Sequence, residues 1–268
     1  MPVRPRTLVP AFLPLTALAL TGCGTDPTQA LPDPVEEPAA HWAYGDGVDA
    51  PAHWGELSED YALCADGSHQ SPVDLPAAVP AADGTTRIEV AAASGVIADT
   101  GHTFQLTIGA AGDGTGLAHD GERYDLVQVH FHTPSEHTVD GEPADAEFHL
   151  VHQNQDGDVL VVGLMAQEGD ATPALRPFLD AVDAGKETTA DLDLPRILPE
   201  ESSAYSYGGS LTTPPCTEEV DWLVLEQQIT LSPAQLAVLT GAENPNARPT
   251  LPLGDREIDG TTLEFVAD

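Results

Sequence analysis

Two histidines, His130 and His132, alternate with apolar residues in the segment that runs from Gln128 to His132. Successive side chains of a β-strand point to opposite faces, so Val129 and Phe131 would face a core while Gln128 and both histidines share the other face. A buried polar row of this kind needs partners, because each unsatisfied group costs about 1 to 3 kcal/mol. Two imidazoles on one strand face can share a metal ion, and imidazole is a usual ligand of Zn²⁺. The pair alone is a weak signal for a metal, because surface or hydrogen-bonded histidines produce the same pattern more often.

A third histidine, His149, lies in a second apolar segment, residues 146–152. Strand alternation places Glu147 on the same face as His149. Three protein ligands with one open position are the coordination pattern of catalytic zinc rather than structural zinc. Gln128 and Glu147 each precede a candidate ligand by two residues, so they are placed to accept the other ring N–H of that ligand.

These histidines need a sheet to hold them, and the rest of the sequence predicts a mainly β fold. Alternating or apolar runs predict strands at residues 87–92, 103–108, 124–133, 146–152, 159–166 and 220–226. Apolar residues at helical spacing before Gly185 predict a short helix near residues 175–182. The run Ser232-Pro233-Ala234-Gln235 has an N-cap, a proline at the first helical position and a capping-box partner, which predicts a second helix. Gly- and Pro-rich turns between many strands favour a mostly antiparallel sheet in a single domain.

The charge of the chain limits its partners. The 268 residues contain nine Lys plus Arg and 44 Asp plus Glu, for a net charge of -35. A field of this sign repels nucleic-acid phosphates and anionic lipid surfaces, but it does not oppose a neutral small substrate or a cation. The 41% hydrophobic content is too high for a fully disordered chain.

The N-terminal residues resemble a bacterial targeting device. Arg4 and Arg6 precede an apolar stretch, residues 7–21, that fits the core of a signal peptide. It ends in Leu20-Thr21-Gly22-Cys23, which is similar to a lipobox, although an ordinary signal peptide with a chance cysteine is the alternative. We therefore expect a lipoprotein-type signal peptide at 1–22, an acylated Cys23 with a Pro-rich acidic tether at 23–40, and one catalytic domain at 41–268. The protein would be exported and lipid-anchored in the cell envelope.

The cysteine count agrees with export. If Cys23 is set aside, two of the three cysteines remain, Cys64 and Cys216. An exported chain enters an oxidising compartment, where such a pair can form a disulfide. We expect these two to form a disulfide bond.

Seven ordered blocks of the sequence resemble the alpha-class carbonic anhydrases, bacterial exported type. The blocks are residues 41–45 (HWAYG), 70–74 (QSPVD), 130–132 (HFH), 135–140 (SEHTVD), 146–152 (AEFHLVH), 209–216 (GSLTTPPC) and 246–249 (NARP). Several ordered blocks are more specific than any one motif. The sequence departs from the vertebrate pattern of the family in the loop before Ser135. Here only Thr133 and Pro134 lie between His132 and Ser135, whereas the vertebrate loop is longer.

This resemblance implies a fold and an activity. The fold would be a large twisted, mostly antiparallel sheet with a few short peripheral helices. His130, His132 and His149 would bind Zn²⁺. A zinc-bound hydroxide would attack carbon dioxide and give bicarbonate and a proton reversibly, which makes the chain a zinc lyase.

The match also implies roles for two threonines. Thr212 corresponds to the gatekeeping threonine of the family, with Glu136 as its acceptor. An ionised glutamate can only accept, so the Thr212 hydroxyl would donate to Glu136 and accept from the zinc hydroxide. Thr213 would contact bicarbonate. The alternative for both threonines is a polar turn before two prolines.

Further residues receive roles from the same match. His102 corresponds to the proton-shuttle position, and its alternative is an exposed loop histidine without a role. The disulfide Cys64–Cys216 matches one in exported members. The apolar wall for carbon dioxide would consist of Val151, Val161, Leu211, Val220 and Trp222. Gln128, Glu147 and Asn246 would support the zinc ligands.

The implied partners are few. Carbon dioxide and bicarbonate are the expected small-molecule substrate pair, nucleic acid is excluded, and membrane contact is expected only through the lipid at Cys23. A homodimer is compatible with the sequence. Two other functions stay open: a catalytically inactive surface-binding module on the same fold, and a zinc esterase activity that uses the same site.

Overall fold

The computed structural model describes residues 40–80, 82–109, 115–119, 121–243 and 245–267. Residues Ala40–Asp268 form one compact unit. The expected signal peptide, Cys23 and nearly all of the expected tether lie outside the described residues. Within the described part of the chain, no helix is long and apolar enough to cross a bilayer.

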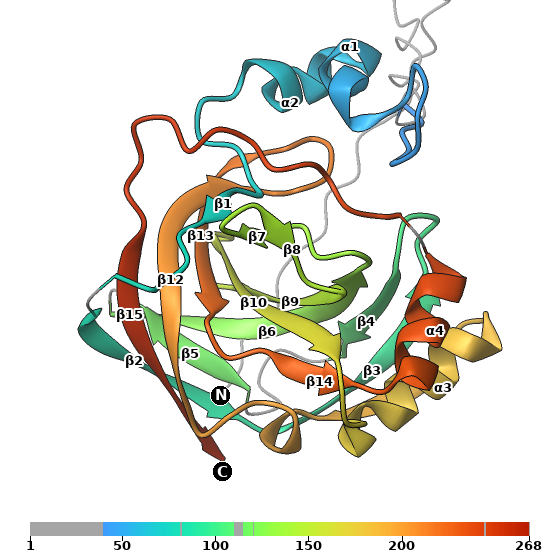
Figure 1. Ribbon diagram of the computed structural model, residues 1–268, viewed down its shortest axis with the longest axis vertical. Helices are drawn as coiled ribbons and strands as arrows, with labels where there is room; N and C mark the ends of the chain where they lie inside the picture. Colours follow the sequence, from blue (N-terminus) through green and yellow to red (C-terminus); the bar gives the residue numbers. More distant parts are fainter. Residues whose placement is uncertain (1–39, 81, 110–114, 120, 244, 268) are drawn as a thin grey trace, which may run out of the picture. The chain divides into compact units, whose positions relative to one another are not determined.

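A twelve-stranded mixed sheet dominates the described unit (Figure 1). Its strands are β2 (Ala82–Val90), β3 (Ala92–Asp99), β4 (Phe104–Ile108), β5 (Gly116–His119), β6 (Glu122–His132), β9 (Ala146–Gln153), β10 (Val159–Glu168), β11 (Thr188–Asp193), β12 (Glu201–Ser210), β13 (Glu218–Leu225), β14 (Ile229–Leu231) and β15 (Asp259–Ala267). The sheet is strongly twisted. In Figure 1, β12 and β15 run close to vertical, whereas β6 and β9 run close to horizontal. Strand β9 pairs antiparallel with both β6 and β10.

Smaller elements surround the sheet. A three-stranded sheet contains β1 (Asp74–Leu75), β7 (Thr138–Val139) and β8 (Glu142–Pro143). The helices and 3₁₀ turns are η1 (Pro51–His53), α1 (Trp54–Leu57), η2 (Glu59–Tyr61), α2 (Leu63–Asp66), η3 (Pro173–Leu175), α3 (Arg176–Ala184), η4 (Leu194–Arg196) and α4 (Pro233–Ala242). The mainly β, mostly antiparallel architecture with short helices is confirmed. The parallel pairs β10–β13, β10–β14 and β15–β2 were not anticipated.

The predicted strands are present, most boundaries differ from the prediction by one or two residues, and two of the differences have clear local causes. The predicted strand 87–92 in fact spans the turn between β2 and β3. The Thr115 hydroxyl bonds both the N–H and the C=O of Ala91 there, which interrupts the ladder. The strand predicted to end at Thr133 ends one residue earlier, at His132. The Thr133 N–H donates to Asn246 Oδ1 and the Thr133 hydroxyl donates to Glu243 O, so this residue leaves the sheet.

Both helix predictions are confirmed. Helix α3 buries Phe178, Leu179 and Val182 on one face and ends where Gly185 adopts φ of 61°, a conformation that glycine favours. Helix α4 opens with the expected capping box between Ser232 and Gln235. The two helices pack against each other at one side of the sheet (Figure 1).

Buried apolar side chains form two clusters. The larger holds Leu106, Phe131, Phe148 and many other sheet residues beneath α3 and α4. The second cluster is defined by Val73, Leu75, Val161, Met165, Tyr205, Tyr207, Val220, Trp222 and Val224. Because β6 and β9 turn apolar residues such as Phe131 and Phe148 to the larger cluster, His130, His132 and His149 emerge on the opposite face.

Candidate metal centre

The three predicted histidines meet at one point because β6 and β9 are in register. His130 is the direct partner of His149 across the two strands, and His132 is two residues further along β6. Ring centroids lie 5.0 Å apart for His130 and His132, 5.0 Å for His130 and His149, and 4.6 Å for His132 and His149. One nitrogen from each ring lies within 4.8 Å of the others. This is a compact three-nitrogen site.

Each of the remaining ring nitrogens has an acceptor oxygen beside it. His130 Nδ1 lies 2.8 Å from Gln128 Oε1, and His149 Nε2 lies 3.1 Å from Glu147 Oε1. His132 Nδ1 lies 2.6 Å from the backbone oxygen of Asn246. If these nitrogens donate, the lone pairs that remain are on His130 Nε2, His132 Nε2 and His149 Nδ1. The predicted supporting residues are therefore beside the rings, with Asn246 acting through its carbonyl.

The free nitrogens fit a cation. His132 Nε2 is buried and makes no hydrogen bond, which is costly for a polar atom. His130 Nε2 and His149 Nδ1 lie 3.3 Å apart, so two lone pairs would face each other without a positive charge between them. Burial lowers the pKa of all three imidazoles, to about 4 for His132, and thus favours the neutral form that binds metals. Three neutral imidazole nitrogens suit Zn²⁺.

Glu136 lies beside this site despite the short loop. Its N–H and the N–H of His137 each donate to Glu147 Oε2 at 2.9 Å, which fixes the turn after Pro134. Glu136 Oε1 accepts from Arg248 N at 2.9 Å, and Oε2 lies 3.4 Å from His132 Nε2. Burial raises the pKa of Glu136 to about 7, while His149 and the Thr212 hydroxyl oppose the shift. The predicted Glu136 and Thr212 are thus neighbours.

A cavity of about 240 Å³ opens onto the histidines and contains the predicted His102 and Thr213. It is lined by Trp42, Tyr44, Thr100, His102, Thr103, Gln105, Gln128, His130, His132 and Thr213. The His102 ring stacks on Trp42 with a centroid distance of 3.5 Å and an interplanar angle of 12°. Burial and His41 lower the pKa of His102. The stacking partner was not anticipated from the sequence.

The predicted apolar wall is continuous in the structure. Val151, Val161 and Trp222 occupy paired positions on the neighbouring strands β9, β10 and β13. Val161 and Trp222 belong to the second cluster, as does Val220, and Val151 and Leu211 pack against it. The Trp222 ring meets His149 edge-on at a centroid distance of 4.9 Å. An apolar surface therefore adjoins the three-nitrogen site.

As expected, a disulfide joins Cys64 to Cys216, which lie 152 residues apart in the sequence. Cys216 is fully buried and follows the loop that carries Thr212 and Thr213. Its N–H donates to Thr213 O at 2.8 Å, and Gln70 Nε2 donates to its carbonyl at 3.0 Å. The bond thereby anchors the threonine loop to the segment around Cys64.

Reduction of this disulfide is expected to lower the free energy of unfolding by about 2 to 5 kcal/mol and to reduce activity before the sheet unfolds. The threonine loop loses its anchor while the strands keep their pairing. Activity and far-ultraviolet circular dichroism should be followed together during titration with a reductant. The double variant Cys64→Ser/Cys216→Ser is the control, since reductant should not affect it. A reduced protein with unchanged turnover would show that loop and bond are uncoupled.

Three residues near the site, His137, Tyr207 and Arg248, received no role from the sequence. His137 places Nδ1 2.8 Å from Glu147 Oε1 and Nε2 2.7 Å from the Tyr207 hydroxyl. Arg248 supplies the N–H that holds Glu136. His137, Glu147 and His149 also bring ligand-type atoms within 4.8 Å of one another, but Glu147 Oε1 already lies 2.8 Å from His137 Nδ1 and 3.1 Å from His149 Nε2. We therefore place the metal among His130, His132 and His149.

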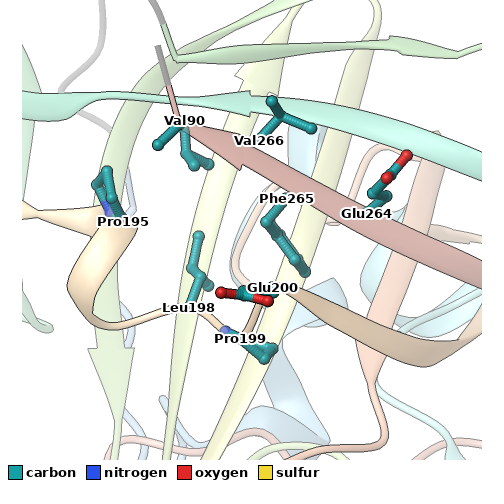
Figure 2. Close-up of a pocket in the computed structure, with 9 residues that line it drawn as sticks. Val90, Pro195, Leu198, Pro199, Glu200, Glu264, Phe265 and Val266 are labelled. Carbon is teal, nitrogen blue, oxygen red and sulfur yellow. The ribbon is translucent and has the colours of Figure 1, made fainter.

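A second cavity, of about 360 Å³, has none of this chemistry. It is lined by Val90, Pro195, Leu198, Pro199, Glu200, Glu264, Phe265, Val266 and Ala267. Figure 2 shows mostly apolar side chains around it. Its two glutamates are exposed, and no histidine or cysteine lines it. The histidine site is the stronger candidate for function.

Known proteins share this architecture. The model of the family described as eukaryotic-type carbonic anhydrase matches residues 49–261. A carbonic anhydrase from Pectobacterium carotovorum is 37% identical over 225 residues, which cover 82% of this chain and 91% of that protein. The structure of an alpha-carbonic anhydrase from Thermovibrio ammonificans with sulfanilamide has a TM-score of 0.76 at 35% identity, covering 82% of this chain and 99% of that one. A structure of dioscorin with ascorbate has a TM-score of 0.75 at 31% identity, covering 84% and 99%.

Proposed function

The chain belongs to the eukaryotic-type carbonic anhydrase family, and we propose that it carries out reversible carbon dioxide hydration with Zn²⁺ held by His130, His132 and His149. The observation that carries the zinc assignment is the convergence of three buried imidazole nitrogens from β6 and β9. Bound zinc would lower the pKa of a coordinated water and so supply a nucleophile near neutral pH, an effect for which carbonic anhydrase is the standard example.

Glu136 and Thr212 would orient the nucleophile. A nearby divalent cation favours the ionised form of Glu136 over the protonated form that burial favours. An ionised Glu136 can only accept, so the Thr212 hydroxyl donates to it. The lone pair of that hydroxyl is then left to accept from the nucleophile. Thr213, in the wall of the same cavity, is placed to contact bicarbonate.

The apolar wall would receive carbon dioxide. Val151, Val161, Leu211, Val220 and Trp222 surround one side of the site and offer no competing charge. Carbon dioxide is neutral, so an apolar surface can hold it without a strong donor. Bicarbonate is charged, so the same surface favours its release into the cavity.

His102 would carry the product proton from the cavity to buffer, because an imidazole can exchange protons near neutral pH. We expect His102→Ala to lower kcat at least ~10-fold and to leave kcat/KM nearly unchanged, since proton export follows the chemical step. High concentrations of imidazole buffer should restore kcat. His69→Ala, which removes an exposed histidine outside the cavity, is the control. A His102→Ala enzyme with normal kcat in dilute buffer would remove His102 from the proton path.

Gly163 makes room for the carboxylate behind His149. A Cβ at this position would lie 2.9 Å from Glu147 Oε1, an atom already held by hydrogen bonds. We expect Gly163→Ala to weaken zinc affinity about 10- to 100-fold, because partners of metal ligands have effects of that size. Gly208→Ala is the matched control, since nothing lies within 4 Å of the Cβ it adds. Competition with a chelator measures both, and equal affinities would contradict the proposed role of Glu147.

The site of action is proposed to be outside the cytoplasm. The Cys64–Cys216 disulfide agrees with an oxidising compartment. We extend this to a signal peptide at 1–22, lipid anchoring at Cys23, a tether at 23–40 and a catalytic domain at 41–268. Mass spectrometry of the mature N-terminus tests the anchor, because an acylated Cys23 should be the first residue.

The main alternative is an inactive binding module. The likeness to dioscorin, solved with ascorbate, gives this alternative a concrete ligand. The complete histidine trio favours the enzyme, and an esterase activity at the same site would be secondary. Zinc analysis combined with stopped-flow hydration of chelated and reconstituted protein separates these functions. The enzyme requires activity that is lost with zinc and returns with it, whereas zinc-free protein that cannot be reconstituted would favour the module.

A further inference from the structure

A buried chain of hydrogen bonds runs from the Glu147 carboxylate to the end of β12. His137 Nδ1 lies 2.8 Å from Glu147 Oε1, and His137 Nε2 lies 2.7 Å from the Tyr207 hydroxyl. The Tyr207 hydroxyl lies 3.0 Å from Ser71 Oγ, which in turn lies 3.1 Å from Ser210 N. All five residues are at most 4% exposed, so water does not compete for these bonds.

The Glu147 end of the chain fixes one proton. Glu147 Oε2 accepts from the N–H groups of Glu136 and His137, and Oε1 lies beside His137 Nδ1 and His149 Nε2. The two backbone N–H groups can only donate, so this carboxylate acts as an acceptor, and the hydrogen of its 2.8 Å contact with His137 lies on Nδ1.

The other bonds can all run in one direction. The Ser210 N–H can only donate, so Ser71 Oγ accepts from it, and the Ser71 hydrogen is available for the Tyr207 oxygen. The Tyr207 hydrogen is then directed to His137 Nε2, which bears a lone pair in the neutral Nδ1–H tautomer. Every donor in the chain therefore points toward Glu147.

Packing around the ring fixes the position of the Tyr207 hydroxyl. Its ring stacks on Trp222 with an interplanar angle of 9°, and the Arg256 guanidinium lies 5.6 Å from the ring centroid. A Cβ at Gly209 would come within 2.2 Å of Ser71 Oγ, so glycine at this position allows Ser71 to reach the tyrosine. The hydrogen-bond chain therefore depends on the packing around the Tyr207 ring and on the glycine at position 209.

We propose that Tyr207 is a positioning residue for the metal centre, because its hydroxyl holds His137 in the Nδ1–H tautomer and thereby keeps Glu147 aimed at His149. This inference rests on the proposed role of His149 as a zinc ligand. Without the hydroxyl, His137 Nε2 is a buried lone pair without a partner. The ring relieves this by turning from Glu147 or admitting water, and the orientation of His149 is lost.

The test compares Tyr207→Phe with Tyr205→Phe. Tyr205 is on the same strand, is equally buried, and loses one hydrogen bond, to Pro76 O at 2.8 Å, when its hydroxyl is removed. Zinc release into excess dipicolinate should become about 10- to 100-fold faster in Tyr207→Phe and change less than about twofold in Tyr205→Phe. Equal release rates in the two variants would overturn the proposal and leave the zinc site intact. A wild-type protein that takes up no zinc would overturn the proposed function itself.

A second measurement does not depend on a substitution. Long-range ¹H–¹⁵N spectra of the zinc-loaded wild-type protein report the tautomer of each histidine. We expect His137 to carry its proton on Nδ1 and to show a bare Nε2 that accepts a hydrogen bond. A proton on Nε2 would reverse the direction of the chain and overturn the proposal.

Discussion

Replacing His130 with alanine is expected to abolish carbon dioxide hydration. His130 supplies one of three nitrogens, and its loss leaves two ligands on an ion that needs three protein ligands and one open position. A bound metal contributes several kcal/mol to transition-state stabilisation, so the fall in kcat/KM should be at least ~10³-fold. Stopped-flow hydration and zinc content should be measured on the same sample.

His53→Ala is the control for this experiment, because His53 is exposed and contacts Glu56 outside the site. It should keep both zinc and turnover. A His130→Ala protein that hydrates carbon dioxide at the wild-type rate would show that the ion, or the chemistry, is elsewhere.

The second large effect is expected at Thr212. Thr212→Ala removes the hydroxyl that links the Glu136 carboxylate to the nucleophile, and loss of one oriented hydrogen-bonding group in an active site costs about 10²- to 10³-fold. Zinc content should stay at the wild-type level, since Thr212 is not one of the three nitrogen ligands. The reduction should appear in kcat/KM as well as in kcat, because the nucleophile is misdirected from the first encounter.

Thr212→Ser is the matched variant, because it keeps the hydroxyl and removes one methyl group. It should retain most of the activity. If Thr212→Ala and Thr212→Ser lose activity equally, packing of the loop rather than the hydroxyl would be the important property. Full activity in Thr212→Ala would contradict the role given to Glu136 as its acceptor.

The central part of the site could be predicted because strand alternation is local. A period of two puts His130 and His132 on one face, and the same rule puts Glu147 beside His149. The sequence could not show that β6 and β9 are neighbours in this register, and only the resemblance joined the three histidines. The disulfide prediction required only an even count of cysteines after Cys23 is set aside.

The parts that escaped prediction involve backbone groups and polar strands. The Asn246 carbonyl holds His132 from 114 residues away in the sequence, and the Arg248 N–H holds Glu136 from 112 residues away. Both are backbone groups, so the residue type at these positions gives no sign of the contact. Strand β12 contains serines and two glycines, so its pattern did not indicate a buried strand. Yet that strand carries Tyr207, which connects the metal centre to the rest of the fold. Prediction from the sequence was therefore limited by the pairing of distant segments, which residue types alone do not specify.

The central claim is that three imidazole nitrogens bind one zinc ion. Anomalous diffraction from crystals of the zinc-loaded protein, collected on both sides of the zinc absorption edge, tests it most directly. We predict a single strong peak within bonding distance of His130 Nε2, His132 Nε2 and His149 Nδ1. A peak at His137 and Glu147 instead, or no peak in a protein that still hydrates carbon dioxide, would contradict the account.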